Sequence, residues 1–251
     1  MILDPVFYAV AVPAVILMGL AKGGFAGVGA ISLPAIAMII SPVQAAAILL
    51  PILIVQDVVG VWAFRRDIDR RILTLMIPTA AVGILGGWLL AAQVSAEVVL
   101  GVLGAISILF SAHRLWLLRG GAIQAPANAP PWVGALCGIA SGFTSQIAHA
   151  GQPPFQIYVL PKNLPPAVLV GTTAVYFAVV NWLKVPAYLA LGQFTPQNLA
   201  TAGALVPVAV ASTFAGVWLV RRINPRRFYV IIYGLMIPVG ALLIWKAFTA
   251  G

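Results

Sequence analysis

The sequence is poor in charged side chains, which make up only 8% of its 251 residues, whereas 62% of the residues are apolar. A soluble domain carries about 25% charged residues. A chain with so few cannot cover a water-facing surface, so the composition predicts an integral membrane protein. Long polar stretches are also lacking, which leaves no room for a second, soluble domain within this sequence.

Cysteine is nearly absent too, and the single Cys137 excludes an intrachain disulfide and a cysteine-based metal site. No Gly-x-x-x-x-Gly-Lys-Ser/Thr motif for nucleotide phosphates occurs. We therefore expect no cofactor and no metal. The net charge of +9 does not indicate nucleic-acid binding, because the ten arginines form short clusters at the ends of apolar segments. Such clusters are typical of the cytoplasmic loops of membrane proteins.

Long apolar segments fill most of the chain. A membrane span needs about 20 apolar residues, and the full-length candidates are 43–64, 72–92, 98–117, 165–192, 200–220 and 228–248. The regions 5–40 and 132–161 are apolar but interrupted by glycine and proline. Each is predicted to form either two short spans or a hairpin that dips into the membrane. Asp4 precedes the first run without a positive segment, so we expect no cleaved signal peptide.

The arginine clusters predict the direction of the spans. Residues 65–71, 221–227 and the region of Arg114 and Arg119 should face the cytoplasm. The loops 93–97 and 192–198 contain no cation and should face outward. Both termini then lie outside, in a bacterial-type cytoplasmic (inner) membrane crossed several times.

The two halves of the sequence resemble each other. Residues 76–100 align with 205–229 through their prolines and central glycines, and 19–24 align with 138–143. The alternative interpretation is that all apolar segments look alike.

Equivalent loops carry opposite charge, since 93–97 is free of cations and its counterpart 221–227 is strongly basic. Equivalent loops on opposite sides of a membrane indicate an inverted repeat. The predicted units are a membrane repeat at 1–118, a polar cytoplasmic linker at 119–131 and a second membrane repeat at 132–251.

The predicted fold class is an all-α polytopic membrane protein. Its two inverted-topology repeats would place broken or re-entrant helices together at the bilayer midplane. This architecture is typical of secondary transporters. Irregular backbone at membrane depth is tolerated only where it is buried in protein or lines a cavity. The breaks around 22–34 and 141–154 therefore mark the predicted substrate site.

Four motifs carry a family resemblance: GLAKGGFAGVGAISLP, GFTSQIAHAGQPPFQIYVLP, VGTTAVYF and VNWLKVPAYLALGQF. The most specific part is Ser-x-x-x-His-x-Gly-x-Pro-Pro, followed by Gly-Thr-Thr and then Asn-x-x-Lys-x-Pro. On these motifs the chain resembles the sulfite exporter TauE/SafE family over essentially its whole length. The resemblance implies a multi-span carrier for small sulfur-containing anions, such as sulfite or an organosulfonate like sulfoacetate.

Charged side chains at mid-span cost about 3 kcal/mol or more and call for a functional hypothesis. Lys22, at the glycine-rich break, either contacts an anion or extends to an interface. Lys184 follows Asn181 on the same helical face and either binds the anion or pairs with Asp57. Asp57 could instead carry a coupling proton, helped by Gln56. The residues alone leave these alternatives open.

His149 stands among polar residues within the second break and can be neutral or charged at cellular pH. We predict that it binds substrate or a proton; the alternative is a hydrogen-bonded core histidine. A short helix starting beside Gln152 would direct its positive end and the freed N–H groups near Gly151 at an anion.

The neighbouring hydroxyls of Ser141, Thr144, Ser145, Thr172 and Thr173 either donate to the anion or allow close helix packing. The predicted substrate-binding residues are Lys22, Ser145, His149, Gly151, Gln152, Thr172, Thr173, Asn181 and Lys184, with Gln56 and Asp57 as a coupling or structural pair.

The predicted function is a secondary transporter that works by alternating access. The alternatives are an anion channel and an intramembrane hydrolase that uses Ser145 and His149, four residues apart. No third orienting carboxylate for such a hydrolase is evident, since Asp57 is the only acid expected at mid-span, so no catalytic residue is predicted. The expected partners are a small anion, the lipid bilayer and protons or another coupling ion. The sequence leaves open whether a homodimer forms.

Overall fold

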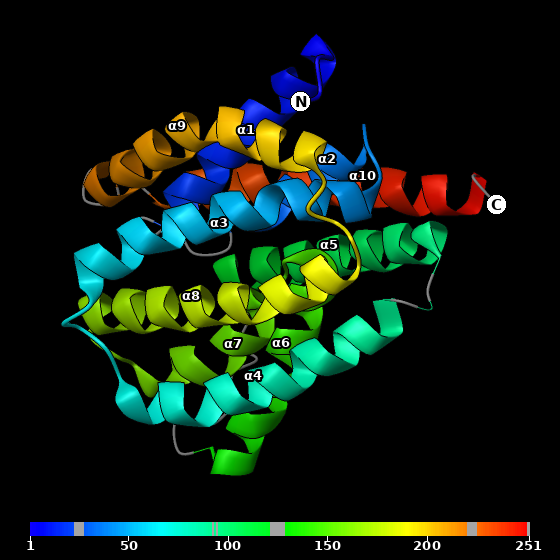
Figure 1. Ribbon diagram of the computed structural model, residues 1–251. Coiled ribbons are helices and arrows are strands. Elements are labelled where there is room, and N and C mark those ends of the chain that lie inside the picture. The colour runs from blue at the N-terminus through cyan, green and yellow to red at the C-terminus, as the bar shows by residue number, and fades with distance from the viewer. Residues whose placement is uncertain (23–27, 92, 94, 121–128, 220–224, 250–251) are drawn as a thin grey trace.

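The computed structural model describes residues 1–22, 28–91, 93, 95–120, 129–219 and 225–249. The regular structure of these residues is helical throughout (Figure 1). The elements in chain order are α1 (Pro5–Lys22), η1 (Val28–Ile31), α2 (Ser32–Ala37), α3 (Pro42–Phe64), α4 (Arg70–Ala91), α5 (Ala96–Leu118), α6 (Pro131–Ala148), α7 (Gln152–Val159), η2 (Leu160–Lys162), α8 (Pro166–Ala190), α9 (Pro196–Leu219) and α10 (Pro225–Thr249).

Six of these helices, α1, α3, α4, α5, α8 and α9, are long and apolar enough to cross a membrane. Large apolar side chains such as Trp62, Leu109 and Trp132 are exposed on the outside, where lipid would cover them. The protein is therefore an all-α, multi-pass membrane protein, as the composition predicted. The full-length spans predicted from the sequence correspond to α3, α4, α5, α8, α9 and α10.

Proline shapes several helix boundaries. It is the first residue of α1, α3, α6, α8, α9 and α10, where its missing N–H costs nothing and its fixed φ suits the first turn. Proline also occurs within long helices, where neighbouring helices can compensate for the lost hydrogen bond. Helix α8 continues through Pro186 to Ala190.

Both interrupted regions fold into hairpins. In the first, η1 and α2 return along α1, and the Ser32 hydroxyl donates to the Ala14 carbonyl at 2.8 Å. In the second, α7 returns along α6, and the Ser141 hydroxyl donates to the Gly151 carbonyl at 2.6 Å. Each region thus consists of one 18-residue helix, α1 or α6, and a short arm that returns along it. The predicted start of a short helix at Gln152 is confirmed.

The long arm of each hairpin packs against a helix of the other half of the chain. Helix α1 runs parallel to α9, with Gly19 against Ser212 and Gly216 against Leu20. Helix α6 runs parallel to α4 in the same way, with Gly138 against Thr79. This reciprocal exchange is the packing expected of an inverted repeat. The repeat itself remains a prediction.

The central pair is formed by α3 and α8, which lie side by side and run antiparallel (Figure 1). Gly60 of α3 faces Ala174 of α8, and Gly171 of α8 lies against the Phe64 carbonyl. Continued along the helices, this register places Lys184 opposite the middle third of α3.

The two ends of the helix bundle differ in charge. The loop between α3 and α4, at the left of Figure 1, carries exposed arginines, and its Asp69 amide donates to the Thr172 hydroxyl at 2.8 Å near the start of α8. We call this the arginine-rich end. At the opposite end the N-terminus is tied to α9, because the Ile2 amide donates to the Thr201 hydroxyl at 2.9 Å. The arginine-rich end is the one predicted to face the cytoplasm.

Candidate functional site

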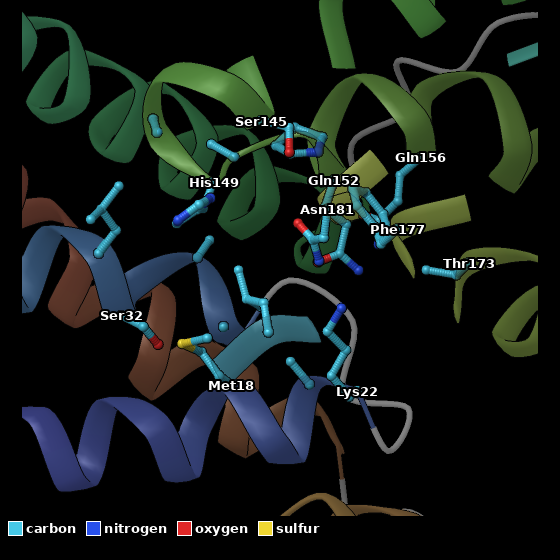
Figure 2. Close-up of a pocket in the computed structure, with 18 of the residues that line it drawn as sticks. Met18, Lys22, Ser32, Ser145, His149, Gln152, Gln156, Thr173, Phe177 and Asn181 are labelled. Atoms are coloured by element: carbon cyan, nitrogen blue, oxygen red, sulfur yellow. The ribbon is translucent and has the colours of Figure 1, made fainter. Parts of the chain in front are cut away.

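A cavity of about 320 Å³ lies between the two hairpins and the central pair of helices. Its walls combine apolar side chains from α1, α3 and α8 with polar groups that converge from both halves of the chain (Figure 2). The polar lining residues are Lys22, Ser32, Arg114, Ser145, His149, Gln152, Gln156, Thr173, Asn181 and Lys184.

Lys184 is completely buried in this wall. Its Nζ lies 2.7 Å from His149 Nδ1 and donates to the Ser145 carbonyl at 3.3 Å. The other ring nitrogen, His149 Nε2, lies 3.0 Å from the Ala46 carbonyl. A carbonyl oxygen can only accept, so we assign the imidazole proton to Nε2. His149 Nδ1 then accepts a hydrogen bond from the Lys184 amino group.

His149 occupies its place because α6 ends there. Its backbone is left-handed, with φ 50° and ψ 24°, a conformation that is uncommon for a residue with a side chain. The following amides close the helix end, since His149 N donates to Ser145 O at 3.1 Å and Ala150 N to Thr144 O at 3.2 Å. Strained backbone of this kind is often found at functional sites. Here it turns the chain toward α7 and holds the imidazole against α3.

Aromatic rings cover the side of His149 that faces away from the arginine-rich end. The Tyr188 ring lies nearly parallel to the imidazole, with a centroid distance of 6.3 Å, and Phe194 lies 5.9 Å beyond Tyr188. Tyr188 is buried and its hydroxyl donates to the Gln146 carbonyl at 3.4 Å. This stack lies between His149 and the loop 192–198.

Asp57 stands behind the cavity wall as the centre of a second cluster. One carboxylate oxygen forms an ion pair with the Lys22 ammonium, and the other accepts from the Asn181 amide at 2.6 Å. The structure thus pairs Asp57 with Lys22, and not with Lys184 as one of the alternatives had it. Lys22 does not extend to an interface, because its side chain turns inward and only 16% of it is exposed. The reason is that α1 and α3 meet at this level, which sequence distance does not reveal.

Basic side chains outnumber acidic ones around the cavity in the described structure, with Lys22, Arg114 and Lys184 in its lining. Among the residues that the structure describes, Lys22 and Asp57 form the one ion pair. Lys184 and Arg114 line the same space with neutral partners only. Buried cations without a counter-ion are costly, and within a membrane they mark pathways for substrates or ions.

Most of the predicted site residues meet at this cavity. Lys22, Ser145, His149, Gln152, Thr173, Asn181 and Lys184 all line it. His149 and Thr173 lie on opposite sides of the labelled group, with Asn181 between them (Figure 2).

Besides Asp57, three predicted residues lie outside the lining and have structural contacts instead. Neighbouring residues of a helix point about 100° apart, so Thr173 faces the cavity and Thr172 does not. The Thr172 hydroxyl instead accepts a hydrogen bond from the Asp69 amide. Gly151 packs tightly against Ser141. Gln56 donates to the Val15 carbonyl at 3.4 Å and joins α3 to α1.

Arg114 and Gln156 line the cavity but were not predicted from the sequence as site residues. Arg114 was assigned to a loop cluster, although it lies inside the predicted span 98–117. An arginine within a span was the signal that could have identified it. Gln156 lies on α7 one turn after Gln152, on the helix that the Pro-Pro pair begins.

The geometry gives no support to the hydrolase alternative. Both ring nitrogens of His149 are engaged by Lys184 and Ala46. Ser145 contributes its carbonyl oxygen to Lys184, and its hydroxyl has no basic partner in the described structure. A serine nucleophile needs an adjacent base.

An all-α membrane protein with a cavity lined by basic side chains between two helix hairpins has the architecture of a membrane transport protein. The sequence matches the family model described as sulfite exporter TauE/SafE over residues 11–243, and the chain belongs to that family of membrane transporters. No single curated protein and no solved structure matches the chain.

Proposed function

We propose that the protein is a secondary transporter that carries a small sulfur-containing oxyanion, such as sulfite or an organosulfonate like sulfoacetate, through this cavity by alternating access. The observation that carries the proposal is Lys184. Its side chain is fully buried, lines the cavity and has only neutral hydrogen-bond partners in the described structure. A bound oxyanion would be its counter-ion.

The donor groups favour an oxyanion over a cation or a neutral solute. An ammonium has three N–H groups, and Lys184 uses two of them for His149 and Ser145. Its third N–H can donate to the substrate. Asn181 uses one amide N–H for Asp57 and has a second. By contrast, the Thr173 hydroxyl already donates to the Leu169 carbonyl at 2.7 Å, so it can only accept.

A proton on His149 is the coupling ion that we propose. Protonation of Nδ1 would end its hydrogen bond from Lys184 and place two positive charges side by side. A bound anion would offset this repulsion. Anion and proton therefore favour each other's binding, which is the linkage that proton-coupled transport needs.

The shape of the cavity supports alternating access. Its lining follows α8 from Lys184 to Leu169, which at 1.5 Å per residue is about 22 Å toward the arginine-rich end. On the opposite side, the stacked rings of Tyr188 and Phe194 lie beyond His149. We propose that this arrangement is the inward-facing state, and that movement of the two hairpins about the central pair α3 and α8 opens the other side.

The test is uptake of labelled sulfite, sulfoacetate, thiosulfate and sulfate into proteoliposomes, with and without a pH gradient. We expect saturable uptake and counterflow of at least one sulfur-containing anion. Lys184→Met and His149→Ala should abolish it, whereas Lys246→Met, a charge change outside this cavity, should not. Wild-type uptake in Lys184→Met would reject the proposal, and currents far above carrier rates would indicate a channel instead.

A further inference from the structure

A second cation, Arg114, reaches the cavity from α5. It lies four residues before the end of that helix, partly buried, and lines the same space as Lys184. Its Nη1 donates to Gln156 Oε1 at 3.0 Å, and its Nε donates to the Tyr233 hydroxyl at 3.3 Å. The guanidinium carbon also lies 5.6 Å from the centre of the Tyr233 ring. Arg114 is thus held in one orientation by groups from α7 and α10.

Among the described residues these contacts engage only part of the guanidinium. It carries five N–H groups, of which two donate to neutral oxygens of Gln156 and Tyr233. No carboxylate within the described residues forms an ion pair with it. A fixed guanidinium with unused N–H groups is suited to bidentate binding of an oxyanion.

Arg114 and Lys184 lie at different depths of the cavity. Arg114 is one helical turn from the arginine-rich end of α5, whereas Lys184 lies opposite the middle of α3. In Figure 2, Gln156, the partner of Arg114, lies on the other side of Asn181 from His149, the partner of Lys184.

The cavity has room for more than one position. One water molecule needs about 10–15 Å³ of cavity volume. The cavity has about 320 Å³. A three-oxygen anion such as sulfite would fill only a fraction of it. One oxyanion bound at Lys184 therefore leaves the space beside Arg114 open.

We infer that Arg114, oriented by Gln156 and Tyr233, forms a second binding position for a small oxyanion at the entrance of the cavity on the arginine-rich side. An anion that enters from this side contacts the guanidinium first and then moves to Lys184. The inference rests on the proposed transport function. The alternative is that Arg114 only ties α5, α7 and α10 together.

The test is the KM for sulfite, measured separately from each face in vesicles of known orientation. Arg114→Gln should raise KM from the arginine-rich face at least tenfold and leave KM from the opposite face within about twofold. Arg114→Lys keeps the charge but loses the planar, two-pronged guanidinium. Its KM from the arginine-rich face should therefore lie between those of the wild type and Arg114→Gln. Arg119→Gln is the matched control, because Arg119 is an exposed arginine at the end of the same helix.

Tyr233→Phe separates binding from a structural role. It removes one acceptor of Arg114 and leaves the guanidinium in place. A purely structural Arg114 predicts similar losses in Tyr233→Phe and Arg114→Gln. The entrance position predicts a clearly smaller rise in KM for Tyr233→Phe than for Arg114→Gln, because Gln156 and the aromatic ring still orient the guanidinium. Equal losses, or an unchanged KM in Arg114→Gln, would overturn this inference alone. Absence of any wild-type uptake would overturn the proposed function and this inference together.

Discussion

At the scale of single residues, the two ammonium groups of the cavity have different surroundings. Lys22 faces the carboxylate of Asp57, whereas Lys184 faces the neutral His149 Nδ1 and a carbonyl oxygen. The charge of Lys22 is compensated whether or not the cavity is occupied. Lys184 has no carboxylate partner among the described residues, so under the proposed function only a bound anion would compensate its charge. The two lysines should therefore respond oppositely to removal of their charge.

We expect Lys22→Met to destabilise the protein and Lys184→Met not to. Without Lys22, the buried carboxylate of Asp57 would keep only Asn181 as partner. Removing one partner of a buried ion pair costs about 3–5 kcal/mol, and the lower value applies because Lys22 is partly exposed. Removing the unpaired charge of Lys184 should leave the thermal midpoint equal or higher. Thermal unfolding of the purified variants in detergent measures both.

The double variant Lys22→Met with Asp57→Asn is the control for this pair. It removes both charges, so it should regain most of the stability that Lys22→Met loses. A Lys184→Met variant less stable than Lys22→Met would contradict the assignment of these two roles.

At the scale of elements, glycines let the hairpins approach the helices of the other half. A Cβ added to Gly142 of α6 would lie 2.0 Å from the Ala80 carbonyl of α4, and one added to Gly83 of α4 would lie 2.0 Å from the Ile139 carbonyl. Close backbone approach at small residues is the usual basis of helix packing in membranes. The position of His149 at the end of α6 depends on this contact.

We predict that Gly142→Ala lowers the free energy of unfolding by about 1–3 kcal/mol, the usual cost of overpacking. The added methyl group would push α6 away from α4 and displace His149 from Lys184, so anion uptake should fall as well. Gly86→Ala on α4 is the matched control, because a Cβ there meets nothing within 4 Å. Thermal unfolding and uptake rates of the two variants decide; equal stability would contradict the packing argument.

At the scale of the whole molecule, the exposed arginines and the cavity lie toward the same end of the helix bundle. The arginine-rich end carries Arg65, Arg66, Arg70 and Arg71, and the cavity extends toward that end. Arginine clusters stay on the cytoplasmic side of a membrane. We thus expect the arginine-rich end, from which Arg114 and Lys184 are reached, to face the cytoplasm.

Labelling of single cysteines tests this orientation. In a Cys137→Ser background, Gln197→Cys should react with a membrane-impermeant maleimide in intact cells, and Asp67→Cys only after the membrane is opened. Both positions are exposed and lie at opposite ends of the structure. The Cys137→Ser parent without an added cysteine is the control. The reverse labelling pattern would show that the arginine-rich end faces outward.

The sequence by itself determined the membrane class, the positions of the long helices and the second break. These follow from local properties: apolar length sets the spans, proline sets helix starts, and the Gly-x-Pro-Pro run interrupts the chain. The family followed from motifs that are also contiguous in sequence.

Only the tertiary structure decided which polar groups meet. It joined Lys22 to Asp57 across 35 positions and Arg114 to Gln156 across 42, and it turned Thr173 but not Thr172 to the cavity. The physical reason is that helical periodicity fixes which residues share a face, while the packing of distant helices decides what each face meets.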